Sequence, residues 1–292
     1  MSPEIKTLAV LGTGTMGRGI AHVSALAGYV THLFDTNASA LQKAQATIHR
    51  NLAKGVELGK VAADAAEAAR QGLHLHENLA TAVADADLVI EAVPEDMALK
   101  IRLFGEVSAA CPAHALFASN TSALSITEMA AGADRPERFA GMHFFNPVHV
   151  MKLLELVRGL QSSDETLEIM RQVGVRMSKE VVLVHEAPGF VTSRINALIG
   201  NEAFRMLQEG VASAEDIDKA LKLGLNHPMG PFEMVDLVGL DVRLSILEYL
   251  HKHLGEAFRP NHLLIQHVKA GRLGRKSGRG VYTYDENGER IR

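Results

Sequence analysis

His143, Glu155 and Ser122 are the side chains best suited to chemistry on a small oxygenated substrate. Imidazole is the usual acceptor of a proton from an alcohol, because its ordinary pKa lies near neutrality. His143 closes the apolar run 139–142, and Glu155 stands among aliphatic residues at 153–157. A semi-buried carboxylate there needs a partner, and it would hold a neighbouring imidazole in one tautomer and stabilise its protonated form. The spacing equally permits Glu155 to be an exposed acid on an edge strand.

Ser122 belongs to a polar cluster, residues 119–122, that directly follows the apolar run 115–118. A hydroxyl at the end of a parallel strand can bind a substrate oxygen. Such residues also cap helices, as Ser125 is expected to do, so a structural role competes with the catalytic one. With the histidine and the glutamate, Ser122 has the residue types of a hydrolase triad. It lies outside any G-x-S-x-G turn, which disfavours hydrolysis.

Three glycines in the spacing G-x-G-x-x-G, Gly12, Gly14 and Gly17, follow the apolar run 7–11 and open a helix-forming stretch. This arrangement allows a tight turn and brings bare backbone and a helix N-terminus to a pyrophosphate. Asp35 ends the next apolar run, where a carboxylate can accept hydrogen bonds from ribose hydroxyls and repels a 2′-phosphate. The sequence therefore predicts a dinucleotide site that prefers NAD to NADP.

Alternating strands and helices in the first part of the chain must position these residues. The alternation predicts an α/β fold with a Rossmann-type, mostly parallel sheet, in which His143 and the 119–122 cluster share the ligand-binding edge. The stretch 37–72 is too long for one crossover helix and predicts a projecting helical pair. The expected strands are residues 8–11, 30–34, 73–75, 88–92, 115–118, 139–144, 153–157 and 181–184.

A second, all-helical C-terminal domain is expected over residues 186–292, after a first domain of residues 1–185, because the strand signals vanish there. Ser213 with Asp216 resembles a capping box at the start of one helix. These helices carry more apolar residues than one small core uses, and either a partner subunit or plain core packing accounts for them. The residues are Ile195, Leu198, Ile199, Phe204, Met206, Leu207, Ile217 and Leu221.

The composition is that of an ordinary globular protein, with 47% hydrophobic residues and a formal net charge of −4 over 292 residues. This near-neutral charge does not favour binding to nucleic acids or to membrane surfaces. Cys111 is the only cysteine, so no internal disulfide or cysteine-based zinc site is expected, and we expect no metal. The first strand lies too close to Met1 for a signal peptide, and no stretch is long enough to cross a membrane. We therefore expect a cytoplasmic protein.

Several segments resemble those of a known protein family, and together they are more specific than any single glycine motif. They are GTGTMG at 12–17, SNTSAL at 119–124, HFFNPVHVMKLLEL at 143–156, PGF at 188–190, KLGLNHPMGPFE at 222–233 and GRKSGRGVYTY at 274–284. With these segments the chain resembles, over nearly its whole length, the L-3-hydroxyacyl-CoA dehydrogenase family, and in particular its short-chain bacterial members, which act on 3-hydroxybutyryl-CoA.

The resemblance implies roles for individual residues. His143 would be the catalytic base, Glu155 the acid that orients it, and Ser122 the hydroxyl that binds the substrate oxygen. The projecting helices would contact acyl-CoA, with Asn51 and Lys54 reaching its polar groups, and the C-terminal domain would form a homodimer. The residues near NAD would be Gly12, Gly14, Thr15, Met16, Gly17, Asp35, Glu95, Lys100, Ser122, Asn146 and Lys276.

One position departs from the family pattern PGF-x-x-N-R. Ser193 stands where an active-site asparagine is often found, in the segment Pro188-Gly189-Phe190-Val191-Thr192-Ser193-Arg194. Serine has a shorter reach and lacks the paired donor and acceptor of an amide. Asn196, one helical turn later, is the alternative substrate-binding residue.

We therefore expect an NAD-dependent dehydrogenase that oxidises the 3-hydroxyl of an (S)-3-hydroxyacyl-CoA, or runs the reverse reduction. A same-fold alternative is a dehydrogenase of a free hydroxy acid or sugar acid, which would need cationic groups for the substrate carboxylate. An alternative of another class is a catalytically silent nucleotide-binding or structural protein. Such a protein would have no need to keep His143, Glu155 and Ser122 together.

Overall fold

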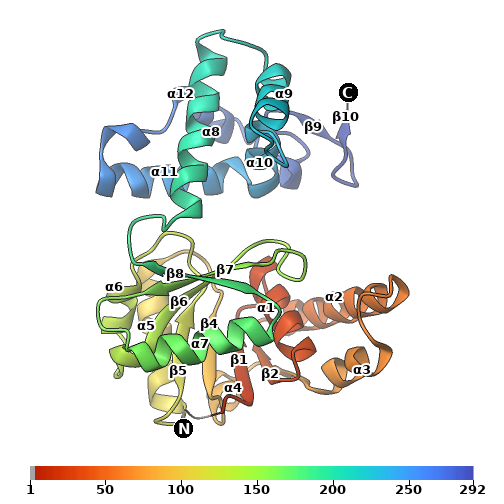
Figure 1. Ribbon diagram of the computed structural model, residues 1–292, viewed down its shortest axis with the longest axis vertical. Coiled ribbons are helices and arrows are strands. Elements are labelled where there is room, and N and C mark those ends of the chain that lie inside the picture. The colour runs from red at the N-terminus through yellow and green to blue at the C-terminus, as the bar shows by residue number, and fades with distance from the viewer. Residues whose placement is uncertain (1–3, 292) are drawn as a thin grey trace. The chain divides into compact units, whose positions relative to one another are not determined.

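The first of two compact units is built on an eight-stranded sheet. The computed structural model describes residues 4–291, and the chain divides after Glu186. The strand order is β3-β2-β1-β4-β5-β6-β7-β8 (Figure 1), and all neighbouring pairs are parallel except β6 and β7. The strands are β1 (Thr7–Leu11), β2 (Val30–Phe34), β3 (Leu73–His76), β4 (Leu88–Glu91), β5 (Leu116–Ser119), β6 (Phe139–Phe144), β7 (Leu153–Arg158) and β8 (Glu180–His185). Every strand expected from the sequence is present.

Helices connect and flank these strands (Figure 1), because parallel neighbours require a crossover connection. They cover both faces of the central strands, so β4, β5 and β6 are buried throughout and read as continuous apolar runs. The helices are α1 (Thr15–Leu26), α2 (Ala38–Glu57), α3 (Ala63–Gln71), α4 (Leu79–Val83), α5 (Met97–Ala110), α6 (Ile126–Ala131) and α7 (Asp164–Arg176), with a 3₁₀ turn η1 (Pro136–Arg138). Helices α2 and α3 are the helical pair expected over 37–72.

The strand order reverses at β1, whose two neighbours are β2 and β4. In open sheets of this kind, ligands bind beside such a reversal, outside the carboxyl ends of the strands. Residues that follow β1, β2, β4, β5 and β6 all reach this edge of the sheet. The topology therefore gathers the glycine loop, Asp35, the 119–122 cluster and His143 at one side of the unit.

The second unit, from Ala187 onward, is helical as expected but closes with a short two-stranded sheet that the sequence did not predict. Ser213 caps α9 as expected, because its hydroxyl accepts from the amide of Asp216. The elements are α8 (Thr192–Gln208), α9 (Ala214–Gly224), α10 (Pro231–Val238), α11 (Leu240–Leu254), η2 (Glu256–Phe258), α12 (His262–Lys269), η3 (Arg275–Ser277), β9 (Thr283–Tyr284) and β10 (Arg290–Ile291).

Two buried aspartates explain the extended segment before β10. Asp236 accepts hydrogen bonds from the amides of Val281 and Tyr282 and from the hydroxyl of Tyr284, at 2.9 Å each. Asp218 accepts from the amide of Phe232 and the hydroxyl of Tyr282, both at 2.8 Å. Residues 281–284 are therefore held against the helices of this unit.

Candidate active site

The glycine loop combines one tight packing contact with one open position. A Cβ on Gly17 would lie 1.9 Å from the carbonyl oxygen of Gly12, so α1 can start this close to β1 only with glycine. Gly12 has a φ of 102°, which favours glycine. A Cβ on Gly14 would meet nothing within 4 Å, and this residue caps α1 without a side-chain hydrogen bond. Bare backbone and unpaired helix amides therefore face open space, as a pyrophosphate requires.

Asp35 directly follows β2 and is held by the glycine loop. Its Oδ2 accepts from the amide of Thr13 at 3.0 Å and from the Thr13 hydroxyl at 2.5 Å, and its Oδ1 accepts from the amide of Asn37 at 3.0 Å. A carboxylate has about four acceptor positions, so Oδ1 keeps one for a ribose hydroxyl. The loop and Asp35 together fit the diphosphate and ribose of NAD.

His143 and Glu155 form a buried pair across the only antiparallel step of the sheet. They are direct partners in the β6–β7 register, and Nδ1 of His143 lies 2.7 Å from Oε2 of Glu155. His143 is 5% exposed and Glu155 is 1% exposed. Glu155 is thus more deeply buried than expected, and it is not on an edge strand because β8 continues the sheet beyond β7. A carboxylate beside Nδ1 favours the tautomer that carries its proton on this nitrogen.

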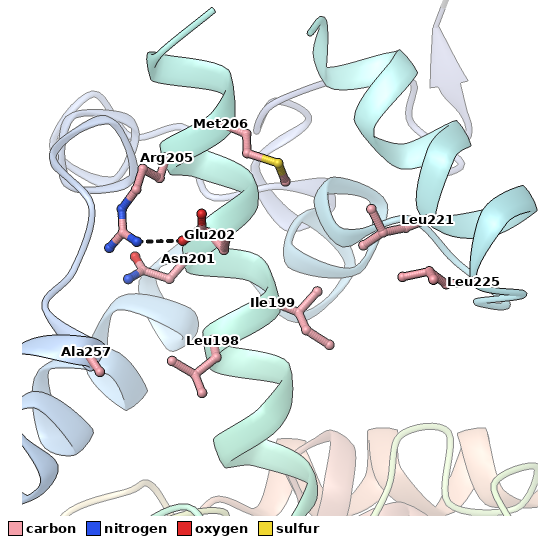
Figure 2. A pocket seen from close by; sticks show the side chains of 9 residues that line it. All are labelled: Leu198, Ile199, Asn201, Glu202, Arg205, Met206, Leu221, Leu225 and Ala257. Atoms are coloured by element: carbon pink, nitrogen blue, oxygen red, sulfur yellow. Dashed lines mark hydrogen bonds and ion pairs between the residues drawn. The ribbon is translucent and has the colours of Figure 1, made fainter. Parts of the chain in front are cut away.

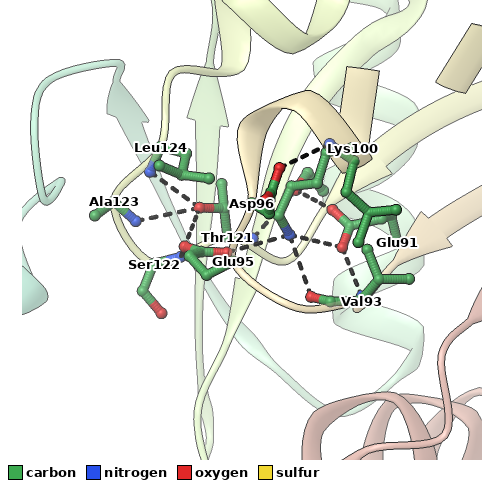
Figure 3. A network of polar contacts seen from close by, with 11 residues as sticks. Glu91, Val93, Glu95, Asp96, Lys100, Thr121, Ser122, Ala123 and Leu124 are labelled. Atoms are coloured by element: carbon green, nitrogen blue, oxygen red, sulfur yellow. Dashed lines mark hydrogen bonds and ion pairs between the residues drawn. The ribbon is translucent and has the colours of Figure 1, made fainter. Parts of the chain in front are cut away.

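Ser122 is fixed by a network of charged side chains (Figure 3). Its amide donates to Oε1 of Glu95 at 3.0 Å, and the hydroxyl of Thr121 donates to the same oxygen at 2.5 Å. Glu95 also pairs with the ammonium of Lys100 at 3.2 Å. The hydroxyl of Ser122 points away from this network in Figure 3. The network therefore sets the Ser122 backbone and leaves its hydroxyl available for a substrate.

Glu91, at the end of β4, anchors this network and was not identified from the sequence. One of its oxygens accepts from Lys100 and the other from the hydroxyl of Ser119, both at 2.6 Å. Burial raises the pKa of Glu91, while the ammonium of Lys100 acts in the opposite direction. Lys100 itself is 1% exposed, so the structure makes it a support for Glu95, and a direct contact between Lys100 and NAD stays a prediction. The sequence feature that could have identified Glu91 is an acidic residue directly after three aliphatic residues of a strand.

Comparison with protein families identifies the chain. The model of the 3-hydroxyacyl-CoA dehydrogenase NAD-binding domain matches residues 7–187, and that of the 3-hydroxyacyl-CoA dehydrogenase C-terminal domain matches residues 189–284. The chain belongs to the 3-hydroxyacyl-CoA dehydrogenase family. It is therefore an oxidoreductase that uses NAD and acts on the CH–OH group of a 3-hydroxyacyl-CoA.

Relatives of this 3-hydroxyacyl-CoA dehydrogenase agree over nearly full length. A probable 3-hydroxybutyryl-CoA dehydrogenase of Bacillus subtilis is 45% identical over 97% of this chain and 99% of its own length. The 3-hydroxybutyryl-CoA dehydrogenase of Bradyrhizobium diazoefficiens is 45% identical over 97% of each chain. The crystal structure of the (S)-3-hydroxybutyryl-CoA dehydrogenase of Ralstonia eutropha superposes with a TM-score of 0.92 at 40% identity, over 97% of this chain and 100% of that one.

The remaining predicted site residues of the dehydrogenase are spread over both units. Thr15 and Met16 form the first turn of α1, and Asn146 is exposed just beyond β6. On α2, Asn51 is half-buried, and the ammonium of Lys54 pairs with Glu57 at 3.1 Å. In the second unit, Ser193 and Asn196 lie in the first turns of α8, and Lys276 pairs with Asp241 at 2.6 Å. The roles implied for these residues stay predictions.

Neither a metal-binding cluster nor a membrane span is present among the described residues. Within residues 4–291, no three or more histidine, cysteine, aspartate or glutamate side chains are grouped so as to hold a metal ion. Among the helices described, none has the length and apolar character needed to cross a bilayer.

Proposed function

We propose that this chain oxidises the 3-hydroxyl of short-chain (S)-3-hydroxyacyl-CoA substrates, above all 3-hydroxybutyryl-CoA, and catalyses the reverse reduction. The observation that carries the proposal is the pairing of His143 with Glu155 at 2.7 Å within the NAD-binding unit. A general base with a fixed tautomer is what removal of a hydroxyl proton requires. The names of the relatives from Bacillus, Bradyrhizobium and Ralstonia support the short acyl chain.

The proposed mechanism assigns one task to each side chain. Nε2 of His143 accepts the proton of the substrate hydroxyl, and Glu155 stabilises the resulting imidazolium through Nδ1. The hydroxyl of Ser122 binds the substrate oxygen and keeps it at the imidazole. NAD, when bound, supplies the acceptor for the hydride that leaves C3. Proton and hydride leave together, so the ketone forms without net charge on the substrate.

The binding roles follow from where the residues lie. Gly12, Gly14, Thr15, Met16 and Gly17 would hold the pyrophosphate of NAD at the start of α1, and Asp35 would hold the adenosine ribose. The other proposed contacts with NAD are Glu95, Lys100, Asn146 and Lys276. For the substrate, Asn51 and Lys54 of α2 would meet polar groups of CoA, and Ser193 or Asn196 of α8 would take the place of the family's asparagine.

A homodimer through the second unit is part of the proposal. Its helices α8 and α9 line an apolar cleft of about 520 Å³, and Figure 2 shows Ile199 and Met206 pointing from α8 toward Leu221 and Leu225. Leu225 is exposed, as is its neighbour Leu223. A contiguous exposed apolar surface of this kind marks an interaction site, and a second copy of the chain is the occupant that closed symmetry favours.

We also place the enzyme in the cytoplasm. Its single cysteine, Cys111, is half-buried, and burial raises the pKa of the thiol. The side chain is therefore kept as an unreactive thiol, which suits a reducing compartment.

One assay tests the activity directly. NADH and NADPH oxidation are followed separately by absorbance with acetoacetyl-CoA, a longer 3-oxoacyl-CoA and free acetoacetate. We expect turnover with NADH and acetoacetyl-CoA, and much less with NADPH because Asp35 repels a 2′-phosphate. Turnover confined to free acetoacetate would favour the free-acid alternative, and a preference for NADPH would contradict the role of Asp35.

A further inference from the structure

A lysine that the proposed reaction does not use lies buried under the loop between β6 and β7. This loop, residues 145–152, joins the strand of His143 to the strand of Glu155. Lys179 comes from the turn between α7 and β8 and is 7% exposed. Its ammonium donates to two carbonyl oxygens of the loop, those of Val148 and of Met151, the second at 2.8 Å.

Burial of this ammonium is costly, because carbonyl oxygens repay less of the lost hydration than a carboxylate does. The burial lowers the pKa of Lys179, as expected for a cation taken out of water. A methionine would fill a similar volume without this cost. The presence of a charged side chain here therefore indicates a specific role. A lysine can donate hydrogen bonds to two backbone carbonyls, and an apolar side chain cannot.

The same loop is packed against the helix of the NAD site. Val148 fits against Gly19 of α1, where a Cβ would come within 2.7 Å of the valine side chain. The imidazole of His149 stacks on that of His22, also in α1, with 5.3 Å between ring centroids. The loop thus contacts both α1 and Lys179.

We propose that Lys179 is a positioning residue that clamps loop 145–152 onto α1. Because the loop is short, its clamping fixes the ends of β6 and β7, and with them the imidazole of His143 and the place of Asn146. The effect on catalysis rests on the proposed function. The effect on the loop does not, because it depends only on the two hydrogen bonds from Lys179 to loop carbonyls.

The activity test compares Lys179→Met and Lys179→Arg with Lys152→Met, which removes an exposed lysine at the end of the same loop. Each folded variant is assayed with NADH and acetoacetyl-CoA. We expect Lys179→Met to lower kcat on the order of tenfold or more, since small displacements of catalytic groups cost this much, and to leave the KM for acetoacetyl-CoA within about twofold. Lys179→Arg should recover part of kcat, and Lys152→Met should behave as wild type. Wild-type kcat in folded Lys179→Met, or an equal loss in Lys152→Met, would overturn the proposal.

Amide hydrogen exchange without substrate or cofactor supplies the second readout. The amides of Val150 and Met151 both donate to the carbonyl of Pro147 at 2.9 Å, so they report whether the loop is closed. We expect at least about tenfold faster exchange at these amides in Lys179→Met, with the amide of Met142 in β6 unchanged. If that variant does not fold, Lys179→Gln, which keeps one donor, is measured instead. Unchanged exchange in the loop, or equal loss of protection throughout the unit, contradicts a positioning role. If wild type fails to turn over acetoacetyl-CoA, the proposed function fails, and the exchange result still decides on the clamp.

Discussion

At the scale of single residues, backbone register accounts for the pairing of His143 with Glu155. His143 and Glu155 are opposite each other in the β6–β7 ladder, and both side chains are buried. The carboxylate therefore needs no flexible loop to reach the imidazole. A carboxylate held by the sheet at Nδ1 is what the proposed role of His143 as general base requires.

His143→Ala should lower kcat by about a hundredfold or more, because the proton acceptor is lost from the transition state. NADH binding, followed by the change in nicotinamide fluorescence, should stay within about twofold of wild type, since the glycine loop and Asp35 are untouched. His74→Ala, which removes an exposed histidine of β3, is the matched control. Comparable turnover in His143→Ala and His74→Ala would remove His143 from the mechanism.

The pairing of His143 with Glu155 could be predicted from the sequence better than the network around Ser122. The two residues were chosen by residue type and by their places in apolar runs, and the structure brings them together. Glu91 was not identified in this way, because the burial that makes it important depends on Lys100 and Ser119, which come from a helix and from another strand. For the same reason the ion pairs of Lys100 with Glu91 and Glu95 could not be predicted from the sequence.

At the scale of elements, two glycines at the start of α1 have different tasks. Gly17 allows close packing of the helix, and Gly14 leaves space for the proposed cofactor. Gly17→Ala should lower the free energy of unfolding, because its Cβ would overlap the carbonyl of Gly12. Gly14→Ala should leave the denaturation midpoint near that of wild type, since a Cβ there meets nothing within 4 Å. It should weaken NADH binding on the order of tenfold, because the methyl group enters the space for the pyrophosphate. A wild-type affinity for NADH in Gly14→Ala would contradict the assigned site.

Helix α1 also gives the fold a dependence on pH. The pKa of His22 falls from 6.5 to about 4, first because of burial and then because of His149 and Lys179. Below pH 6.5 the unfolded chain takes up a proton at this position and the folded chain does not. The contribution of neutral His22 to the free energy of unfolding is therefore fully present above pH 6.5 and is lost as the pH falls toward 4. The expected loss between pH 7 and pH 5 is about 2 kcal/mol.

Urea denaturation at pH 7 and pH 5 measures this loss. In His22→Gln the difference between the two pH values should shrink by about 2 kcal/mol relative to wild type. The control His262→Gln, which removes an exposed histidine at the start of α12, should keep the wild-type difference. If His22→Gln also keeps it, His22 is not the group responsible.

Elements with a strong period were predictable, and those held by distant side chains were not. The strands of the first unit could be read from apolar runs between helices, and the helical pair α2–α3 from the length of 37–72. Strands β9 and β10 have no such pattern. Their segment is extended because Asp236 and Asp218, far away in sequence, accept its hydrogen bonds.

At the scale of the whole molecule, the proposed homodimer predicts a molar mass in solution that can be measured. By size-exclusion chromatography with light scattering, wild type should have about twice the 31.5 kDa mass of one chain. Leu225→Glu should shift it toward one chain, since a carboxylate in an apolar interface is costly. Leu160→Glu, at an exposed leucine of the first unit, should remain a dimer. A wild-type mass of one chain would refute the dimer.

The single antiparallel step in an otherwise parallel sheet has a consequence for turnover. His143 and Glu155 face each other on one rung of the β6–β7 ladder, so the two side chains are aligned without any bound ligand. No part of the free energy of substrate binding is spent on assembling them. That free energy is left for orienting the substrate.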